Sequence, residues 1–277
     1  MSSPGPDAAA ARPAAAPSAS LRVALVQEAS GLDPADNRRR LAEVVADAGP
    51  GADLVVLPEA FARDFGTAGS DVSAFAEPLD GPFVTAAVAA ASAAGTTVLA
   101  GLFETSDDPD RPWNTLVLVD AGGVRASYRK IHLYDSFGYR ESDRLSAGEP
   151  APVVVPVGGF AVGLLTCYDL RFPELARTLV VDHGAEVLVC PAAWLAGEGK
   201  AHHWRTLAAA RAIENTTYVV ATGQPAPRYT GRSVVVDPLG RTVAEAGDGP
   251  EVLRAELRRE VLDEARRTNP SLANRRL

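Results

Sequence analysis

Only two cysteines, Cys167 and Cys190, occur among the 277 residues of this sequence. Two cysteines make no disulfide framework, so we expect a reducing compartment and a cytoplasmic location. The cysteines and the four histidines also lack the spacing of metal ligands. We therefore predict neither a bound metal nor an organic cofactor.

Long apolar runs and excess positive charge are absent as well. No stretch approaches the roughly 20 strongly apolar residues of a membrane-spanning helix. The net charge is −8, from 27 Lys and Arg against 35 Asp and Glu, which argues against a general nucleic-acid or anionic-membrane binder. Nearly all basic residues are arginine, and Lys130 and Lys200 are the only lysines. A lysine in such a background raises the question of why arginine does not serve there.

The first 20 residues are mainly Ala, Pro and Ser and contain almost no large apolar side chain. They bury too little surface to offset the entropy of ordering, so we predict a disordered tail. Their interspersed prolines also make a poor apolar region for a signal peptide. Residues 21–277 form one predicted domain, long enough for a large core.

Apolar periodicity along residues 21–277 predicts an alternation of strands and helices. Strands are expected at 21–27, 52–57, 97–103, 113–119, 124–129, 153–157, 160–165, 186–190, 218–222, 233–237, 242–245 and 251–256. Helices are expected to begin at Asp33-Pro34 and Pro173, and to occupy 82–94, 200–214 and 259–267. No internal repeat or linker interrupts this pattern. It indicates a single α/β domain with antiparallel hairpins mixed into it.

Three ionisable residues stand at the ends of predicted strands: Glu59, Lys130 and Cys167. Catalytic groups concentrate at such ends in layered α/β proteins, because the backbone turns outward there. Taken singly, each has an ordinary explanation as a loop carboxylate, a surface lysine or a buried thiol. Together they form a coherent set for acyl transfer, with a nucleophile, a proton carrier and a cation for the oxyanion. A cation beside Cys167 is expected to favour its thiolate.

A Cys–His enzyme is the competing interpretation. His132 is its best base candidate, because it lies two residues from Lys130. His202 and His203 are adjacent at the start of a helix, so they cannot both face one site. His183 is expected at a helix end.

Three segments resemble the nitrilase superfamily of carbon–nitrogen hydrolases. Residues 57–61 read Leu-Pro-Glu-Ala-Phe, residues 128–135 read Tyr-Arg-Lys-Ile-His-Leu-Tyr-Asp, and residues 166–174 read Thr-Cys-Tyr-Asp-Leu-Arg-Phe-Pro-Glu. Their order of Glu, Lys and Cys is that of the family, and the likeness covers about residues 21–270. The ending Arg-Phe-Pro-Glu, with Arg-Ala-Ile-Glu-Asn at 211–215, resembles the branch of ω-amidases and deaminated-glutathione amidases.

The resemblance implies a four-layer α-β-β-α sandwich and a Glu–Lys–Cys triad. Glu59 would be the general base and acid, Lys130 the cation on the oxyanion side and Cys167 the nucleophile. The family match further places Glu141 as a carboxylate holding Lys130, and the backbone N–H of Tyr168 in the oxyanion hole. Members usually assemble as dimers or larger oligomers, so we expect a homodimer or larger homo-oligomer. The expected binding partner is a small-molecule amide, the substrate.

Residues of the pocket wall are harder to assign. Tyr134, Arg171, Trp194 and Phe137 are candidates, and the loops near 62–80, 134–148 and 195–200 are expected to set the specificity. Arg171 either binds a substrate carboxylate or forms an internal ion pair, and Cys190 is expected in the core.

The sequence as a whole predicts an amidase that hydrolyses a small ω-amide through a Cys167 thioester. The alternatives are a nitrilase, an N-carbamoyl hydrolase and a non-catalytic interaction protein, with a Cys–His protease behind them. Carbamoyl-amino-acid hydrolases of the family carry two adjacent arginines after the nucleophile, and here the first is Leu170.

Overall fold

Two six-stranded sheets form the centre of the computed structural model, which describes residues 19–276. The first sheet has the order β14 (Glu251–Arg258), β1 (Ser20–Gln27), β2 (Leu54–Val56), β3 (Thr97–Glu104), β4 (Trp113–Asp120) and β5 (Gly123–Arg129). The second has the order β13 (Thr242–Glu245), β12 (Val234–Val236), β11 (Tyr218–Gly223), β10 (Val187–Ala192), β9 (Phe160–Leu164) and β8 (Val154–Val157). The predicted tail falls almost wholly on residues 1–18, outside the described part.

Each sheet has a parallel centre and antiparallel flanks. Strands β1, β2 and β3 run parallel in the first sheet, and β9, β10 and β11 run parallel in the second. The remaining pairs are antiparallel, including the β4–β5 and β8–β9 hairpins. Parallel neighbours bring their carboxyl ends to one edge, so the loops after β2, β9 and β10 can share a site.

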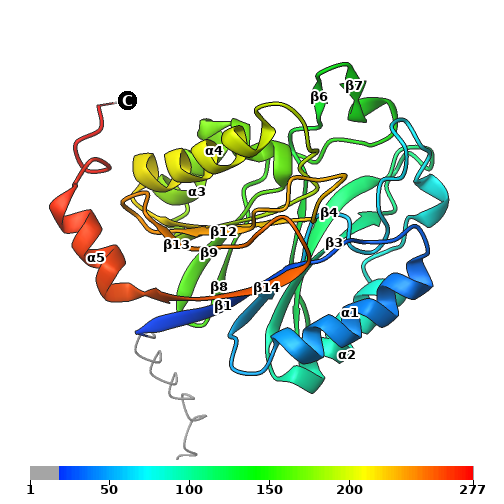
Figure 1. Ribbon diagram of the computed structural model, residues 1–277, viewed down its shortest axis with the longest axis horizontal. Coiled ribbons are helices and arrows are strands. Elements are labelled where there is room, and N and C mark those ends of the chain that lie inside the picture. The colour runs from blue at the N-terminus through cyan, green and yellow to red at the C-terminus, as the bar shows by residue number, and fades with distance from the viewer. Residues whose placement is uncertain (1–18, 277) are drawn as a thin grey trace, which may run out of the picture.

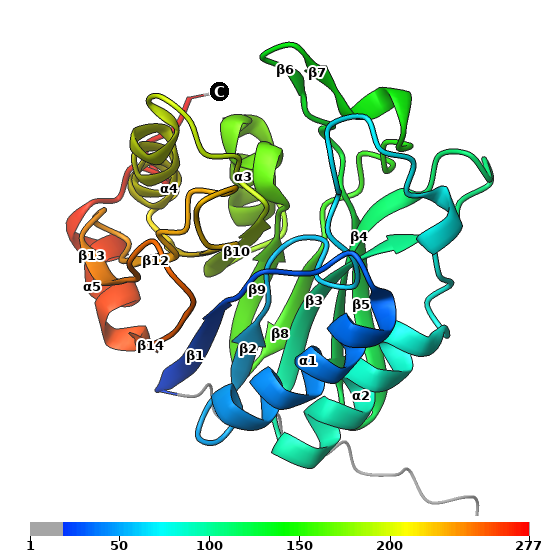
Figure 2. The same cartoon turned by 45° about the vertical axis from the view of Figure 1, so that its right-hand side comes forward.

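Helices cover the outer faces of both sheets (Figure 1). Helices α1 (Pro34–Ala48) and α2 (Pro82–Ala94) lie on the first sheet, and α3 (Pro173–Val181) and α4 (Lys200–Asn215) lie on the second. Helix α5 (Arg259–Thr268) follows β14 at one edge (Figure 2). The predicted α-β-β-α sandwich is confirmed.

Local signals explain the helix boundaries. The Asp33 side chain accepts hydrogen bonds from the Ala35 and Asp36 amides, and Pro34 occupies the first turn of α1. Helix α2 also begins at a proline, and it ends at Gly95 in the left-handed region, with a φ of 63°. The chain can therefore turn sharply from each helix back into the sheet.

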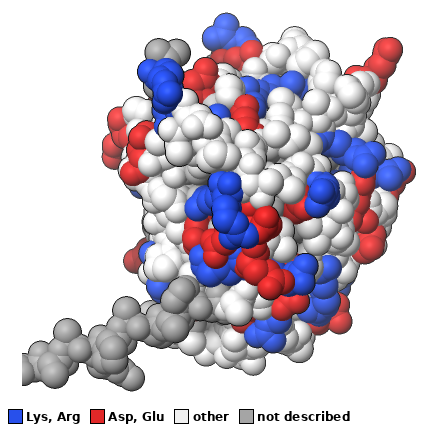
Figure 3. All heavy atoms as spheres, turned by 90° about the vertical axis from the view of Figure 1, so that its left-hand side faces the viewer, with Lys and Arg blue, Asp and Glu red and all other residues white. Residues whose placement is uncertain are grey.

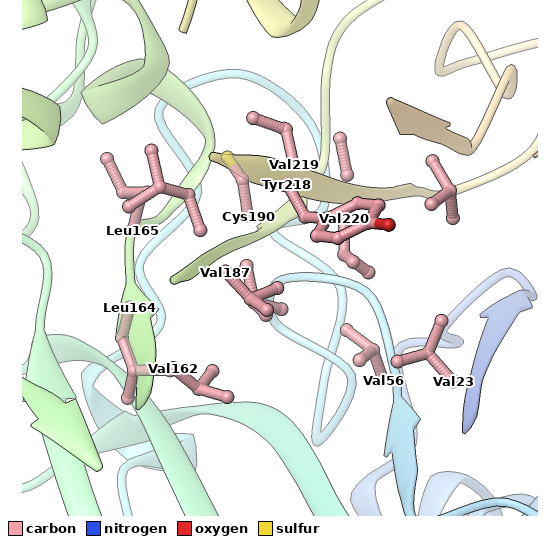
Figure 4. Packing of buried hydrophobic residues seen from close by; sticks show 14 of the residues in the cluster. Val23, Val56, Val162, Leu164, Leu165, Val187, Cys190, Tyr218, Val219 and Val220 are labelled. Carbon is pink, nitrogen blue, oxygen red and sulfur yellow. The ribbon is translucent and has the colours of Figure 1, made fainter. Parts of the chain in front are cut away.

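Alternation of side chains along the strands divides the core into layers. Apolar residues on one face of the first sheet, among them Val55 and Val98, pack against α1 and α2, and Phe83 of α2 belongs to the same buried cluster. Residues on the opposite face meet the second sheet, as Val23 and Val56 meet Val187 and Tyr218 in Figure 4. Cys190, on the opposite face of β10 from Val187, is 0% exposed, which confirms its predicted place in the core.

The structure corrects several predicted boundaries. Strand β2 is shorter than residues 52–57, because Pro58 has no amide hydrogen for a ladder. Strand β10 continues past Cys190 to Ala192. The polar segment after residue 134 contains the small hairpin β6 (Asp135–Ser136) and β7 (Tyr139–Arg140), followed by the 3-10 turn η2 (Glu141–Asp143). Two further 3-10 turns, η1 (Ser73–Phe75) and η3 (Cys167–Arg171), had no clear periodic signal.

Across residues 19–276, every helix is too short or too polar to cross a membrane.

Candidate active site

One pocket opens where the loops after β2, β5, β9 and β10 meet. Glu59, Lys130 and Cys167 all line it. The structure therefore brings together three residues that are up to 108 positions apart in the sequence. The rest of the wall consists of Phe65, Gly66, Thr67, Ala68, Tyr134, Tyr139, Glu141, Tyr168, Arg171, Ala193, Trp194, Leu195, Lys200, Arg228 and Tyr229.

Glu59 is held by three donors. Its Oε1 accepts hydrogen bonds from Lys130 Nζ at 2.9 Å and from Asn114 Nδ2 at 2.8 Å. Its Oε2 accepts one from the Ala193 backbone N–H at 2.7 Å. The side chain is 1% exposed, so these contacts replace water around the carboxylate.

Lys130 lies between two carboxylates. Its Nζ also donates to Oε1 and Oε2 of Glu141, at 3.1 and 2.9 Å. Burial by itself opposes a charge on Lys130, but Glu141 and Glu59 outweigh it and raise the pKa of this ammonium well above its usual value. Burial raises the pKa of Glu141, and Lys130 opposes that rise. Glu141 therefore occupies the position next to Lys130 that the family match assigned to it.

Cys167 begins the turn η3, and its backbone has a φ of 46°. A left-handed backbone is unfavourable for a non-glycine residue and persists only where the surroundings impose it. The carboxylate of Asp169 imposes it here, since Oδ2 accepts the Thr166 amide at 2.9 Å and the Tyr128 hydroxyl at 2.6 Å. The turn thus presents the Cys167 thiol to the pocket next to Glu59 and Lys130.

The expectation that a neighbouring cation favours the Cys167 thiolate is wrong. Burial and the nearby Glu59 carboxylate raise the pKa of Cys167 well above its usual value, and Lys130 only partly offsets them. This raised pKa favours the thiol, and Lys130 is also bound to two carboxylates. Attack therefore requires a base that takes the proton as the sulfur–carbon bond forms.

His132 does not fill that role. Its Nδ1 lies 2.7 Å from Asp169 Oδ1, and its ring stacks on Phe172 with centroids 3.7 Å apart. It is not part of the pocket wall. The geometry thus disfavours the Cys–His alternative, and Glu59 is a carboxylate that lines the pocket together with Cys167.

Comparison with known proteins identifies the family of this arrangement. The model of the carbon–nitrogen hydrolase family matches residues 22–267, which include all three triad positions. The chain belongs to the carbon–nitrogen hydrolase family.

Relatives of this carbon–nitrogen hydrolase include amidases. The deaminated glutathione amidase of Escherichia coli O157:H7 is 43% identical over 224 residues, covering 80% of this chain and 84% of the relative. A member of branch 10 of the nitrilase superfamily from Saccharomyces cerevisiae superposes with a TM-score of 0.80 and 32% identity, over 92% of this chain and 96% of that chain. The amidase of Nesterenkonia sp. AN1, solved as a double mutant with acrylamide, superposes with a TM-score of 0.79 and 29% identity, over 93% and 95%.

Two cations of this hydrolase face the pocket without an acidic partner. Among residues 19–276, no carboxylate forms an ion pair with Arg171 or Lys200. Arg171 lies 4.8 Å from the ring centre of Trp194, and its buried Nε has no hydrogen-bond partner there. Lys200 Nζ donates to the Tyr134 hydroxyl at 2.8 Å and lies 3.7 Å from the ring centre of Phe137. The internal ion pair considered for Arg171 is therefore absent from the described residues.

Three of the four residues that were predicted for the pocket wall are found there. Tyr134, Arg171 and Trp194 line the pocket, whereas Phe137 is 68% exposed and lies outside its wall. Tyr168, the residue after Cys167, also lines the pocket.

Other contacts at the pocket had no signal in the sequence. Arg228 and Tyr229 reach the pocket from the loop after β11 and bind Asp64, at 2.7 and 2.6 Å. Asn114 contacts Glu59 from strand β4. None of them follows a motif or a strand end, and only Lys200 carried a signal, the scarcity of lysine.

Proposed function

We propose that this carbon–nitrogen hydrolase is an amidase that converts a small ω-amide of a carboxylic acid into the acid and ammonia through a thioester on Cys167. The observation that carries the proposal is the convergence of Glu59, Lys130 and Cys167 on one pocket, with Lys130 Nζ 2.9 Å from Glu59. A thiol, a carboxylate and an ammonium supply the three functions that amide cleavage needs.

The first half-reaction forms the acyl-enzyme. Glu59 takes the proton of the Cys167 thiol while the sulfur attacks the amide carbonyl carbon. The oxyanion that forms is stabilised by Lys130 Nζ and the Tyr168 backbone N–H. Glu59 then gives its proton to the nitrogen, the carbon–nitrogen bond breaks, and ammonia leaves a thioester on the sulfur.

The second half-reaction releases the acid. A water molecule loses a proton to Glu59 and attacks the thioester carbon. The second oxyanion collapses, the carbon–sulfur bond breaks, and Glu59 returns its proton to the Cys167 sulfur. All atoms of amide and water then appear in the acid and ammonia.

The charges of the pocket support an acidic substrate. Glu59 and Glu141 are both bound to Lys130, whereas no carboxylate of residues 19–276 pairs with Arg171 or Lys200. A substrate carboxylate is the group that such cations bind most strongly. The name of the deaminated glutathione amidase relative is consistent with this class. Leu170, which is 0% exposed, stands in place of the first of the two adjacent arginines of carbamoyl-amino-acid hydrolases, so that substrate class is disfavoured.

The test is ammonia release from matched amides by purified protein. Succinamate and glutaramate, which carry a carboxylate, should be hydrolysed with a kcat/KM roughly 10-fold or more above that of the neutral propionamide, as for one charged hydrogen bond. Deaminated glutathione, N-carbamoyl amino acids and nitriles complete the panel. Lys200→Met should raise KM for succinamate and leave KM for propionamide unchanged.

Two cysteine variants test the nucleophile. Cys167→Ser should abolish turnover, and Cys190→Ser should retain it, because Cys190 is buried in the core and is not part of the pocket wall. With an activated ester, Glu59→Gln should accumulate an acyl adduct on Cys167, visible as a mass increase. Hydrolysis of nitriles alone would favour the nitrilase alternative, and no turnover of any compound would favour a non-catalytic protein.

A further inference from the structure

Asn114 on strand β4 contacts Glu59, Glu141 and Lys130, the three charged residues that are buried beside Cys167. Its Nδ2 donates to Glu59 Oε1 at 2.8 Å and lies 3.5 Å from Glu141 Oε1. Its backbone carbonyl accepts the Lys130 backbone N–H at 2.8 Å. The residue is 0% exposed and lies outside the pocket wall, so it does not touch a bound substrate.

The charges around Asn114 explain why an amide stands there. Two carboxyl groups share one ammonium, so Lys130 compensates the negative charge of only one of Glu59 and Glu141. A neutral N–H donor compensates part of the remaining charge without adding a second cation. The Oδ1 atom of Asn114 is buried and has no partner among residues 19–276, which is a cost in free energy. An orientation that leaves Oδ1 unpaired is favoured only because it turns Nδ2 toward the carboxylates.

We propose that Asn114 is a positioning residue that keeps the Glu59 carboxylate charged and oriented toward Cys167. Asn114 and Lys130 fix Oε1, and the Ala193 N–H fixes Oε2, so the carboxylate plane cannot rotate. Without the Asn114 donor, the charged form of Glu59 loses a hydrogen bond and takes up a proton at higher pH. This inference rests on the proposed role of Glu59 as the base.

Other titratable groups also act on Glu59 and belong to the same equilibrium. They come from β5, η2, η3, β7, β10 and the loop after β11: Lys130, Glu141, Cys167, Tyr139, Cys190 and Tyr229. All of them remain in place in an Asn114 variant. A change in the pH dependence of the variant therefore reports the loss of the Asn114 donor. The inflection belongs to the whole set of coupled groups and not to one residue.

The experiment is the pH dependence of Cys167 alkylation by iodoacetamide, followed by the mass of the intact protein. The measurement needs no substrate, because the rate of alkylation depends on transfer of the Cys167 thiol proton to Glu59. In Asn114→Leu, the acid-side inflection should move up by about one pH unit, as expected for a hydrogen bond to a charged group. The kcat for succinamate at pH 7 should fall by roughly 10-fold or more, with KM nearly unchanged.

Thr115→Val is the matched control. Thr115 is the next residue of β4, is also 0% exposed, and donates to the carboxylate of Glu104 at 2.8 Å, away from the triad. It should lower the midpoint of thermal unfolding as Asn114→Leu does and leave the inflection in place. An inflection that stays at the wild-type pH in a folded Asn114→Leu enzyme would overturn the proposal.

Asn114→Asp separates charge from shape. Aspartate has nearly the shape of asparagine, but it lacks the donor and adds a third carboxylate. The proposal predicts an upward shift in this variant too, and it keeps the test open if Asn114→Leu does not fold. Wild-type behaviour of Asn114→Asp would show that only packing matters. If Glu59→Gln keeps the wild-type inflection, the proposed role of Glu59 fails; if it removes the inflection and Asn114→Leu does not shift it, this inference alone fails.

Discussion

At the scale of single residues, both lysines of this arginine-rich chain lie at the same pocket. Lys130 is 2% exposed, and its one nitrogen reaches Glu59 and Glu141 at the same time. A guanidinium is broad and planar, with its donors in a fixed fork, so it cannot take this position without moving one of the carboxylates. The compact ammonium explains why lysine is required there.

Lys130→Arg should therefore lower kcat by roughly 10²–10³-fold, the cost of removing an oxyanion donor. His132→Asn should lose far less, because His132 contacts Asp169 and Phe172 rather than the pocket. Steady-state kinetics of the two variants with succinamate measure the difference. A greater loss in His132→Asn would instead favour Cys–His chemistry.

At the scale of secondary structure elements, the position of Glu59 depends on close contact between its loop and strand β3. Gly101 lies in β3, and a Cβ there would stand 2.5 Å from the Ala60 backbone nitrogen and 3.2 Å from Glu59 Cα. Ala60 itself has a φ of 55°. The backbone that carries Glu59 therefore runs directly over Gly101, which has no side chain.

Gly101→Ala should push the Glu59 backbone away from Cys167 and lower kcat by roughly 10²-fold, the cost of displacing a catalytic group by about 1 Å. Gly249→Ala is the control, since no atom lies within 4 Å of the added Cβ. Wild-type kcat in a folded Gly101→Ala enzyme would show that the loop does not set the position of Glu59.

At the scale of the whole molecule, surface charge is mixed and the buried titratable groups dominate the response to pH. Side chains of both signs intermingle on the face that carries α5 (Figure 3). Inside, burial raises the pKa of Cys190 and of Cys167. A homo-oligomer and a cytoplasmic location stay predictions from the sequence.

Stability should fall as the pH rises above about 8.5, where thiols of the unfolded chain lose their protons. The folded protein keeps both thiol protons, because each folded-state pKa is raised. The unfolded state then binds fewer protons, so the free energy of unfolding decreases by up to about 1.4 kcal/mol per pH unit for each thiol. Below about pH 8.5 neither thiol contributes to the slope.

Cys190→Ala isolates one of these contributions. Thermal unfolding between pH 7 and 10 should show a shallower alkaline decline in this variant, although its midpoint at pH 7 is lower because the core loses an atom. Equal slopes in the variant and the wild type would contradict the assignment to Cys190.

The sequence alone determined most of the elements and singled out Glu59, Lys130 and Cys167, the three strand-end residues that line one pocket. These signals are local: apolar periodicity, Pro34 and Pro173 in first helical turns, and an ionisable residue where each strand stops. The family motifs then placed Glu141 beside Lys130, where it is found.

Only the tertiary structure decided which groups contact Glu59 and in which direction the pKa of Cys167 shifts. Asn114 reaches Glu59 because β4 packs beside β3, and Ala193 does so because β10 ends over the first sheet; neither pairing is a property of its own segment. The thiol form of Cys167 depends on how much water all surrounding elements exclude and on how many carboxylates share Lys130. Such quantities are sums over residues distant in sequence, so no local pattern contains them.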